Sequence, residues 1–236
     1  MGHGTNPIPD FSKMTSAESF TEYLRNTHRA EWEAATDNRF IRELVADEIE
    51  DTVYARYLTL DYAFIDALVS TFGHAVAVAP GMPEKTRFSS FLAVLTNEED
   101  DYFLRCFNAF GLPAPSFDNP VSHPVVDGFN DLMARQRAAG SYLQVLAVLV
   151  TVEWVYLEWA SAAARSGHAT PSRFYLSEWI TLHADPGFAD FVNWMRSELD
   201  REAVLANDDA RARAEAAFVE ALKLEAAFFA AAYDEI

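Results

Sequence analysis

The chain has 236 residues, half of them hydrophobic, and a formal net charge of -18. This length and composition are enough to bury a sizeable core within one large domain. A surface this negative repels phosphate backbones and anionic lipid, which argues against nucleic-acid binding and against binding at a membrane surface.

The N-terminal half is expected to start with a leader and continue as helices. Residues 1–13 contain Gly, Pro and Asn and no apolar signal-peptide core, which predicts a flexible leader before a domain at 14–236. Apolar residues at helical spacing then predict helices from Ser16 through Trp32, over Asn38–Ala46, over Asp47–Thr71 and over Phe88–Phe110. Pro80, Gly81 and Pro83 predict a loop.

The C-terminal half is also expected to be helical, after a Pro-rich connection from Pro113 to Pro124. Helices are predicted over Val125–Ala138, Ser141–Arg165, Ser172–Leu182 and Phe188–Arg201, with a last one capped at Asn207 and running through Tyr233. The longest apolar stretch, Val145–Val152, is far shorter than the ~20 residues of a membrane span. Since no segment alternates with the period of a strand, the chain is predicted to be one all-α domain.

Cys106 is the single cysteine, and the interpretation favoured for it is a small buried apolar residue on a helix. A lone thiol cannot form an intrachain disulfide, which fits a reducing compartment such as the cytoplasm.

The informative positions are acidic residues inside apolar helical stretches, because a buried carboxylate is costly unless it is paired or hydrogen-bonded. Glu153 interrupts an apolar run, and Tyr156 follows three residues later on the same helical face. Asp61 lies among apolar neighbours with Phe64 three residues later, and Glu225 is the acid in the apolar part of the last helix. The competing interpretation is a solvent-facing or ion-paired acid, and 36 acidic residues make such coincidences common.

At these residues the chain resembles the TenA (thiaminase II) family, a branch of the haem-oxygenase-like helical fold, from about Trp32 to Tyr233. The resemblance is carried by the order and spacing of four blocks. The first joins Arg-Phe-Ile-Arg-Glu-Leu at 39–44 to Tyr-Leu-Thr-Leu-Asp-Tyr at 57–62, and the others are Val-Glu-Trp-Val-Tyr at 152–156, the segment 179–188, and Glu225. It implies a single haem-oxygenase-like helical bundle.

The departures from the family pattern bear on the reaction. The better-known subclass has a nucleophilic Cys on the central helix, whereas no Cys occurs between Gly140 and Arg165 and Glu153 lies at or beside that position. This is similar to the Glu-type subclass and argues against thiamine cleavage itself, which is expected to need a thiolate. Phe129 and His183 stand near positions where the family has tyrosines, and a lost phenol alters substrate specificity.

The resemblance implies a hydrolase for a small aminopyrimidine from thiamine breakdown, either the aminomethyl compound or its N-formyl precursor. Asp61, Phe64, Phe129 and His183 would bind the substrate, and Glu153, Tyr156 and Glu225 would carry the chemistry. Glu153 would be the general base toward water, Tyr156 would hydrogen-bond to developing charge, and Glu225 would orient groups or shuttle a proton. The family likeness further implies a homo-oligomer, a dimer or tetramer, with neither metal nor cofactor.

Three alternatives remain open on the sequence. A haem protein of this fold would use His28 as proximal ligand, but the stretch 142–165 lacks the glycines that let a backbone approach haem, and His28 is expected to be a surface or capping residue. A di-iron oxidase would need Glu-x-x-His spacing, which the sequence lacks, and a cofactorless oxidase would favour basic residues on the central helix. The third is a pyrimidine-binding protein without catalysis.

Overall fold

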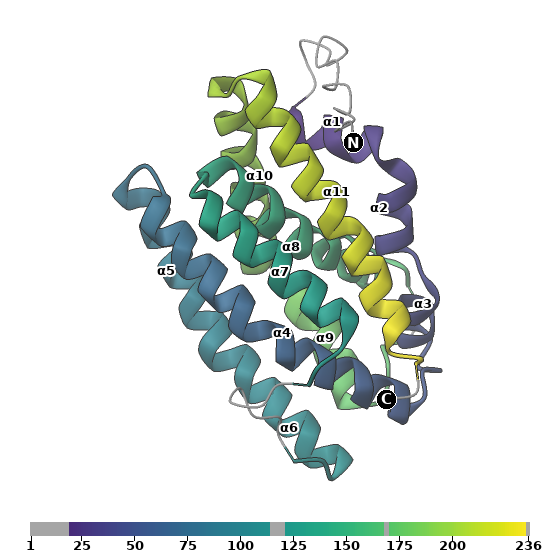
Figure 1. Cartoon of the computed structure of the whole chain (residues 1–236). Coiled ribbons are helices and arrows are strands. Elements are labelled where there is room, and N and C mark those ends of the chain that lie inside the picture. Colours follow the sequence, from purple (N-terminus) through teal and green to yellow (C-terminus); the bar gives the residue numbers. More distant parts are fainter. Residues whose placement is uncertain (1–18, 114–120, 168–169, 235–236) are drawn as a thin grey trace, which may run out of the picture.

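The computed structural model describes residues 19–113, 121–167 and 170–234, and it is helical without a strand in these ranges. The expected leader at 1–13 and most of the 113–124 connection lie outside the described residues. In chain order the elements are α1 (Phe20–Thr27), α2 (Arg29–Thr36), α3 (Arg39–Val45), α4 (Asp51–Val78), α5 (Met82–Val94), the π-helical η2 (Leu95–Glu99), α6 (Asp100–Phe110), α7 (Pro124–Ala139), α8 (Tyr142–Arg165), α9 (Phe174–His183), α10 (Pro186–Leu205) and α11 (Asp208–Ala231) (Figure 1).

Several of these helices begin at a polar side chain that caps a free backbone N–H of the first turn. Ser141 accepts from the amide of Gln144, and Asn207 accepts from the amide of Ala210. At the other end, α7 stops at Gly140, which has a φ of 65° in the left-handed region that favours glycine. The same signals in the sequence placed both ends of α8 and the start of α11 within a residue or two.

Prolines that lay outside the predicted helices instead lie in the first turn of helices. α5 begins at Met82 with Pro83 in its first turn, and α10 begins at Pro186 rather than at Phe188. Proline is tolerated there because its missing N–H would have no partner within the helix, and its fixed φ suits the helix. The predicted loop around residues 80–83 is therefore shorter than expected.

Other boundaries also differ from the expectation. The first predicted helix is broken at His28, whose φ of -107° and ψ of 41° separate α1 from α2. α4 continues past Thr71 to Val78, with Gly73 inside the helix, and ends before Pro80. α11 ends at Ala231, short of Tyr233.

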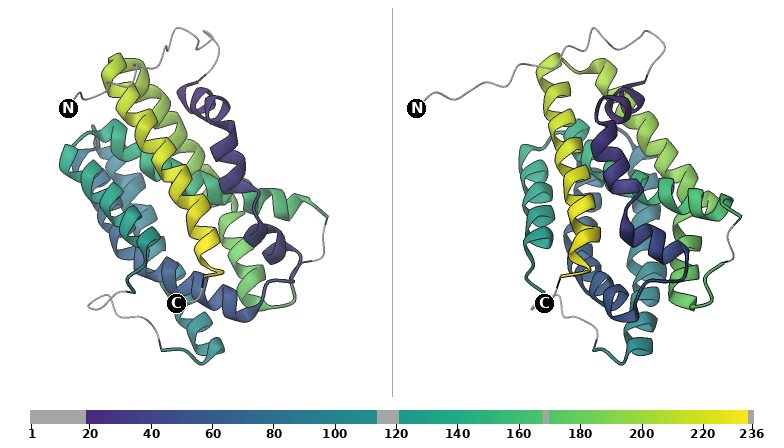
Figure 2. Two further views of the ribbon diagram at one scale, coloured as in Figure 1. Left: turned by 45° about the vertical axis from the view of Figure 1, so that its right-hand side comes forward. Right: turned by 90° about the vertical axis from the view of Figure 1, so that its right-hand side faces the viewer.

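α8 lies at the centre of the bundle, where it packs against α2, α4, α7, α9, α10 and α11 (Figures 1 and 2). Every residue from Tyr142 to Leu157 is buried, so this helix has no polar face. It is the one helix among the described residues that is long and apolar enough to cross a membrane, and 78% of its apolar window is buried inside the protein. Its apolar sides are covered by other helices of the same chain.

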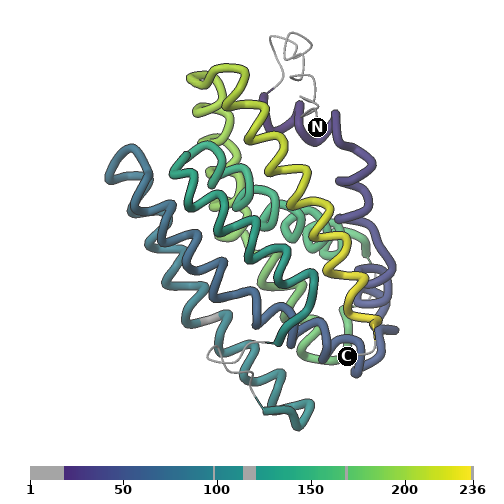
Figure 3. Tube along the Cα trace, viewed as in Figure 1, coloured from purple at the N-terminus to yellow at the C-terminus, as the bar shows by residue number. Residues whose placement is uncertain are grey.

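The helices α4 and α5 form a hairpin, and α5, η2 and α6 follow one another as a continuous rod beside α4 (Figure 3). The π-helical turn at η2 lies in the middle of this rod. Such turns contain a backbone irregularity that often occurs at functional sites.

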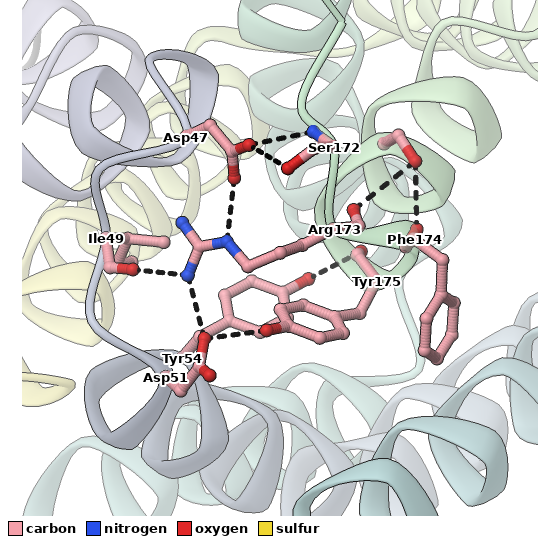
Figure 4. Close-up of polar contacts among 9 residues, drawn as sticks. Asp47, Ile49, Asp51, Tyr54, Ser172, Arg173, Phe174 and Tyr175 are labelled. Carbon is pink, nitrogen blue, oxygen red and sulfur yellow. Dashed lines mark hydrogen bonds and ion pairs between the residues drawn. The ribbon is translucent and has the colours of Figure 1, made fainter.

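A cluster of polar contacts fixes the start of α9 against the segment that leads into α4 (Figure 4). Asp47 accepts hydrogen bonds of 2.7 Å from the amide and the hydroxyl of Ser172, and another of 2.7 Å from Nε of Arg173. Arg173 also donates to Asp51 at 2.7 Å, and the Asp51 carboxylate accepts from the Tyr175 hydroxyl at 2.6 Å. This Asp47–Arg173 clamp sets the position of α9 relative to α4.

Candidate active site

Three acidic side chains from three helices lie close together in the protein interior. Asp61 comes from α4, Glu153 from α8 and Glu225 from α11, with exposed fractions of 5%, 7% and 2%. Burial first, and then the charge on Asp61, raises the pKa of both other acids, and Glu153 adds to the increase at Glu225. The structure thus brings together the three carboxyls that the apolar runs of the sequence singled out.

A small cavity lies between these helices, and we call it the acidic cavity. Its volume of about 30 Å³ has room for ordered water but is far below the roughly 300–1,000 Å³ of a typical ligand pocket. The residues on its wall are Asp61, Phe64, Ile65, Leu68, Leu95, Glu99, Val152, Glu153, Tyr156, Trp179 and His183. A flat heterocycle can therefore enter only if side chains move or if the cavity opens toward a neighbouring space.

Glu225 lies behind the wall of the cavity rather than on it. Its Oε2 atom is buried and has no hydrogen-bond partner among the described residues. An unpaired buried carboxyl oxygen is costly, so this atom is available to a proton or to a donor group that comes within reach.

Glu99 is a fourth acid at the cavity, and sequence reasoning missed it. It ends η2 and lies on the cavity wall, where burial first and then the charges of Glu153 and Asp61 raise its pKa well above the usual range. The run Asn-Glu-Glu-Asp-Asp at 97–101 has the composition of a solvated helical face. The one signal in the sequence is Leu95, a buried residue four positions earlier that shares the cavity wall with Glu99.

Burial dominates the electrostatics of the site. Desolvation raises the pKa of Asp61 from 3.8 to about 7, and a hydrogen bond with Tyr57 opposes the increase. Desolvation and the nearby charge of Asp61 raise the pKa of Glu153 from 4.5 to about 8. The charged groups that influence the pKa of each of these carboxyls are the other carboxyls of the group. Protons are therefore shared within the group near neutral pH.

His183 is held as a neutral ring in this environment. Desolvation lowers its pKa from 6.5 to about 4, with partial compensation from its contact to the Trp179 carbonyl. Because a carbonyl oxygen only accepts, Nδ1 carries the proton and donates to it at 3.0 Å. Nε2 of His183 is left with a lone pair that can accept a hydrogen bond.

Tyr156 lies on the cavity wall and connects it to the deeper core. Its hydroxyl is 2.8 Å from the hydroxyl of Tyr57, and its ring lies 4.8 Å from that of His183. Burial raises the pKa values of both tyrosines well above 10, so both phenols stay protonated. Tyr57, whose hydroxyl lowers the pKa of Asp61, thus connects the acid on α4 to Tyr156 on α8.

The two phenylalanines expected to hold the ring are placed differently from each other. Phe64 lines the cavity. Phe129, which was expected to face Phe64 across the ring, is not on the wall and meets the Phe64 ring edge-on at 4.9 Å. Phe129 also contacts Phe228 at 6.0 Å, so it supports Phe64 from behind instead of forming half of a sandwich.

Residues that other chemistries would use lie elsewhere. Nε2 of His28 is 2.7 Å from Glu215 at the α1–α2 junction, away from the acidic cavity. Cys106 is fully buried, with a pKa raised to about 12 by desolvation, and is not on the wall. In the described ranges no group of three or more His, Cys, Asp or Glu side chains is arranged to hold a metal ion.

The fold and this site define a single-domain helical bundle with a buried group of carboxyls beside an aromatic wall. Solved structures share the fold. A TenA homologue from Pyrococcus furiosus superposes with a TM-score of 0.80 at 19% identity, over 91% of this chain and 100% of that one. A domain of unknown function with a haem-oxygenase-like fold from Shewanella denitrificans superposes with a TM-score of 0.65 at 16% identity, over 92% and 93% of the two chains.

The sequence assigns the family. The chain belongs to the TENA/THI-4/PQQC family, whose model matches residues 25–235. Among curated proteins, the aminopyrimidine aminohydrolase of Halalkalibacterium halodurans is 23% identical over 217 residues, which are 92% of this chain and 96% of that protein. The fold is therefore the haem-oxygenase-like helical bundle that the sequence blocks predicted.

Proposed function

We propose that this protein is a hydrolase that cleaves a C–N bond of a small aminopyrimidine derived from thiamine, with Glu153 as general base. The observation that carries the proposal is the convergence of Asp61, Glu153 and Glu225 in a desolvated site. The charges that raise the pKa of Glu153 and Glu225 there come from the other acids of the group. A relative that covers nearly the whole chain bears the name aminopyrimidine aminohydrolase, which supports the same substrate class.

The charge of the site favours a basic substrate. Buried carboxylates are costly unless a positive group compensates them, and a protonated aminopyrimidine or its exocyclic amine would supply that group. Asp61 would bind the amine and the ring edge, while Phe64 packs against the ring face. Nε2 of His183 would accept a further hydrogen bond from the substrate or from water.

The reaction would be an acid–base hydrolysis. Ionised Glu153 takes a proton from water, and the water oxygen bonds to the carbon of the scissile C–N bond. The bonding electrons pass to the nitrogen, which takes the proton from Glu153 and leaves as the amine. The Tyr156 hydroxyl would donate to charge that develops on oxygen, and Glu225 would hold or return a proton through its unpaired oxygen. General acid–base catalysis of this kind contributes roughly 10²–10⁴-fold.

Glu153→Gln tests the proposal, because glutamine keeps the shape of the side chain and removes the base. We expect kcat for the aminomethylpyrimidine or its N-formyl derivative to fall by roughly 10²–10⁴-fold. The matched control is Glu158→Gln, since Glu158 lies on the same helix outside the cavity wall. Unchanged turnover in Glu153→Gln would remove this residue from the chemistry, and tight binding without turnover in the wild type would favour a binding protein.

The assembly and location of the protein belong to the proposal as well. We expect a cytoplasmic homo-oligomer, a dimer or tetramer, that needs neither metal nor cofactor. Light scattering after size exclusion measures the assembly, and full activity after chelation and dialysis is the expected result for the reaction.

A further inference from the structure

A second, larger hollow lies next to the acidic cavity. We call it the outer groove; its volume is about 510 Å³, and it is bounded by α5, η2, α9 and α10. This volume lies within the usual range of a small-molecule site. Glu99 and His183 line both the outer groove and the acidic cavity, so the two spaces adjoin at these side chains.

Aromatic and aliphatic side chains form much of the wall of the outer groove. Phe91 of α5 and Phe191 of α10 stack with ring centroids 4.1 Å apart and an interplanar angle of 12°. Phe188 lies 6.3 Å from Phe91 and meets the ring of His183 edge-on at 5.2 Å. An apolar wall therefore extends from the boundary with the cavity along the groove.

The charges at the outer groove do not suit an anionic ligand. Arg87 is its basic residue among those described, and its guanidinium donates to Asp190 at 2.5 Å and lies over Trp194 at 5.0 Å. Asp185 and Glu99 add further acidic groups to the lining. A phosphate or carboxylate would meet net negative charge here, whereas an uncharged group would meet the apolar wall without an electrostatic penalty.

The two spaces differ in size and polarity, so each suits a different part of a substrate. The acidic cavity supplies carboxyls for a basic nitrogen but has a volume of only about 30 Å³, whereas the outer groove supplies apolar room but few free polar groups. We propose that the outer groove is the second compartment of the active site and holds an uncharged, apolar acyl group on the nitrogen of the scissile bond. Glu99 and His183 mark the boundary at which that bond lies.

This inference rests on the proposed C–N hydrolysis and extends its substrates to N-acyl aminopyrimidines with acyl groups larger than formyl. In the reaction, the water oxygen bonds to the acyl carbon and the acyl C–N bond breaks. The nitrogen takes a proton, so the products are a carboxylic acid, which leaves from the groove, and the free aminopyrimidine. Hydrolysis of the amide needs no co-reactant besides water.

A filled groove tests the inference. Ser90 is an exposed residue of α5 on the groove wall, and its neighbour Ser89 is exposed on the same helix but is not on that wall. Ser90→Trp places an indole in the groove, and Ser89→Trp is the matched control. The readout is the ratio of kcat/KM for the N-benzoyl over the N-formyl derivative of aminomethylpyrimidine. Thr86→Trp, on the same wall, replaces Ser90→Trp if circular dichroism shows that the latter does not fold.

We expect the wild type to hydrolyse the N-benzoyl derivative. The ratio should fall at least tenfold in Ser90→Trp and stay unchanged in Ser89→Trp. An unchanged ratio in Ser90→Trp, or a wild type that cleaves the N-formyl but not the N-benzoyl derivative, overturns the inference while the proposed hydrolysis stands.

A wild type that cleaves aminomethylpyrimidine but neither acyl derivative overturns the inference while the proposed hydrolysis stands. A wild type that cleaves none of the three compounds contradicts the proposed function, and calorimetry then decides the inference separately. Tighter binding of the N-benzoyl than of the N-formyl derivative, lost in Ser90→Trp, supports the groove as an acyl compartment. Equal binding of the two derivatives overturns it.

Discussion

Glu153 and Asp61 differ from surface acids in that they hold protons near neutral pH. Their pKa values of about 8 and about 7 follow mainly from desolvation. A general base must be ionised to act, whereas a buried carboxyl without a nearby cation prefers to be neutral. Binding of a positively charged substrate would favour ionisation, so the site is poised to become an active base when the substrate is present.

The dependence of kcat/KM on pH should show this. Because kcat/KM reports the ionisation of the free enzyme and Glu153 must lose its proton to act, we expect kcat/KM to decrease as the pH falls below about 8. Initial rates at low substrate concentration across pH 5 to 9 measure the profile. A profile that stays level down to about pH 5 would mean that the base has an ordinary carboxyl pKa and is not Glu153.

Asp61 has a different expected role, since its carboxylate would hold the substrate. Asp61→Asn removes the charge and should raise KM by roughly 10–100-fold, the range that a charge-assisted hydrogen bond of about 1.5–3 kcal/mol gives. We expect a smaller effect on kcat. Asp66→Asn, at an exposed position of α4, is the control, and equal KM values in the two variants would contradict the assignment.

For single residues, the sequence indicates that an acid is buried when it stands in an apolar run but not when it stands in a polar one. Asp61, Glu153 and Glu225 stand out because their neighbours are apolar, and the structure buries all three. Glu99 lies in an acidic run, and a helix elsewhere in the chain makes its position part of a cavity wall. Phe129 packs against Phe64 and is not on the wall, and residue type and order do not reveal whether a ring lies on a wall or behind it.

The element whose position matters most to the site is α9, which carries Trp179 and His183 to the cavity wall. The clamp in Figure 4 holds its first turn, and the clamp depends on Arg173 because that side chain reaches both Asp47 and Asp51. The contacts are charge-assisted and only partly exposed at Arg173, which has 24% of its side chain accessible.

Arg173→Ala should therefore destabilise the protein and loosen α9. We expect a loss of about 1.5–3 kcal/mol in the free energy of unfolding, the range for hydrogen bonds to charged groups, measured by urea denaturation. Arg165→Ala at an exposed position of α8 is the control. Identical midpoints for the two variants would show that the clamp contributes nothing to stability.

Helix boundaries set by a side chain or by a special residue were predictable, and those set by packing were not. Asn207 and Gly140 mark ends that the sequence shows directly. Neither the start of α2 at the His28 break nor the start of the π-helical turn η2 has a capping side chain. Since no propensity signal distinguishes these places from ordinary helix, they remain visible only in three dimensions.

Over the whole molecule, the buried acids Asp61 and Glu153 make the free energy of unfolding depend on pH in the opposite direction from the partly exposed Asp47. The folded pKa values of Asp61 and Glu153 lie above their unfolded values of 3.8 and 4.5. Their contribution to stability is therefore present at low pH and is lost as the pH rises through about 7 to 8. The pKa of Asp47 is lowered from 3.8 by its hydrogen bonds to Ser172 and Arg173. Its contribution to stability is therefore present above pH 3.8 and is lost as the pH falls below that value.

We therefore expect the melting temperature to be several degrees higher near pH 5.5 than near pH 8.5, because 1 kcal/mol corresponds to roughly 2–4 °C in a chain of this size. Glu153→Gln should reduce the difference and stabilise the protein at the higher pH, where the wild type must keep a charge buried. Scanning calorimetry at both pH values measures this, and a wild type more stable at pH 8.5 would contradict the raised pKa values.

The overall architecture was largely predictable, since helical periodicity without alternation defines an all-α domain and the order of the blocks indicates the family. The outer groove was not predictable. Its walls come from α5 with η2 and from α9 with α10, which are far apart in the sequence. A groove forms only where side chains from such segments leave space between them, and the pattern of residues along the sequence does not show how large that space is.

The absence of a polar face on α8 has a consequence for synthesis of the chain. Residues 142–165 leave the ribosome before α9, α10 and α11 do, although α10 and α11 cover much of the central helix in the finished fold. During that interval the sides of this apolar helix that α9, α10 and α11 later cover face water, and such exposed surface promotes aggregation. The nascent protein should therefore need chaperone protection until its last helix has emerged.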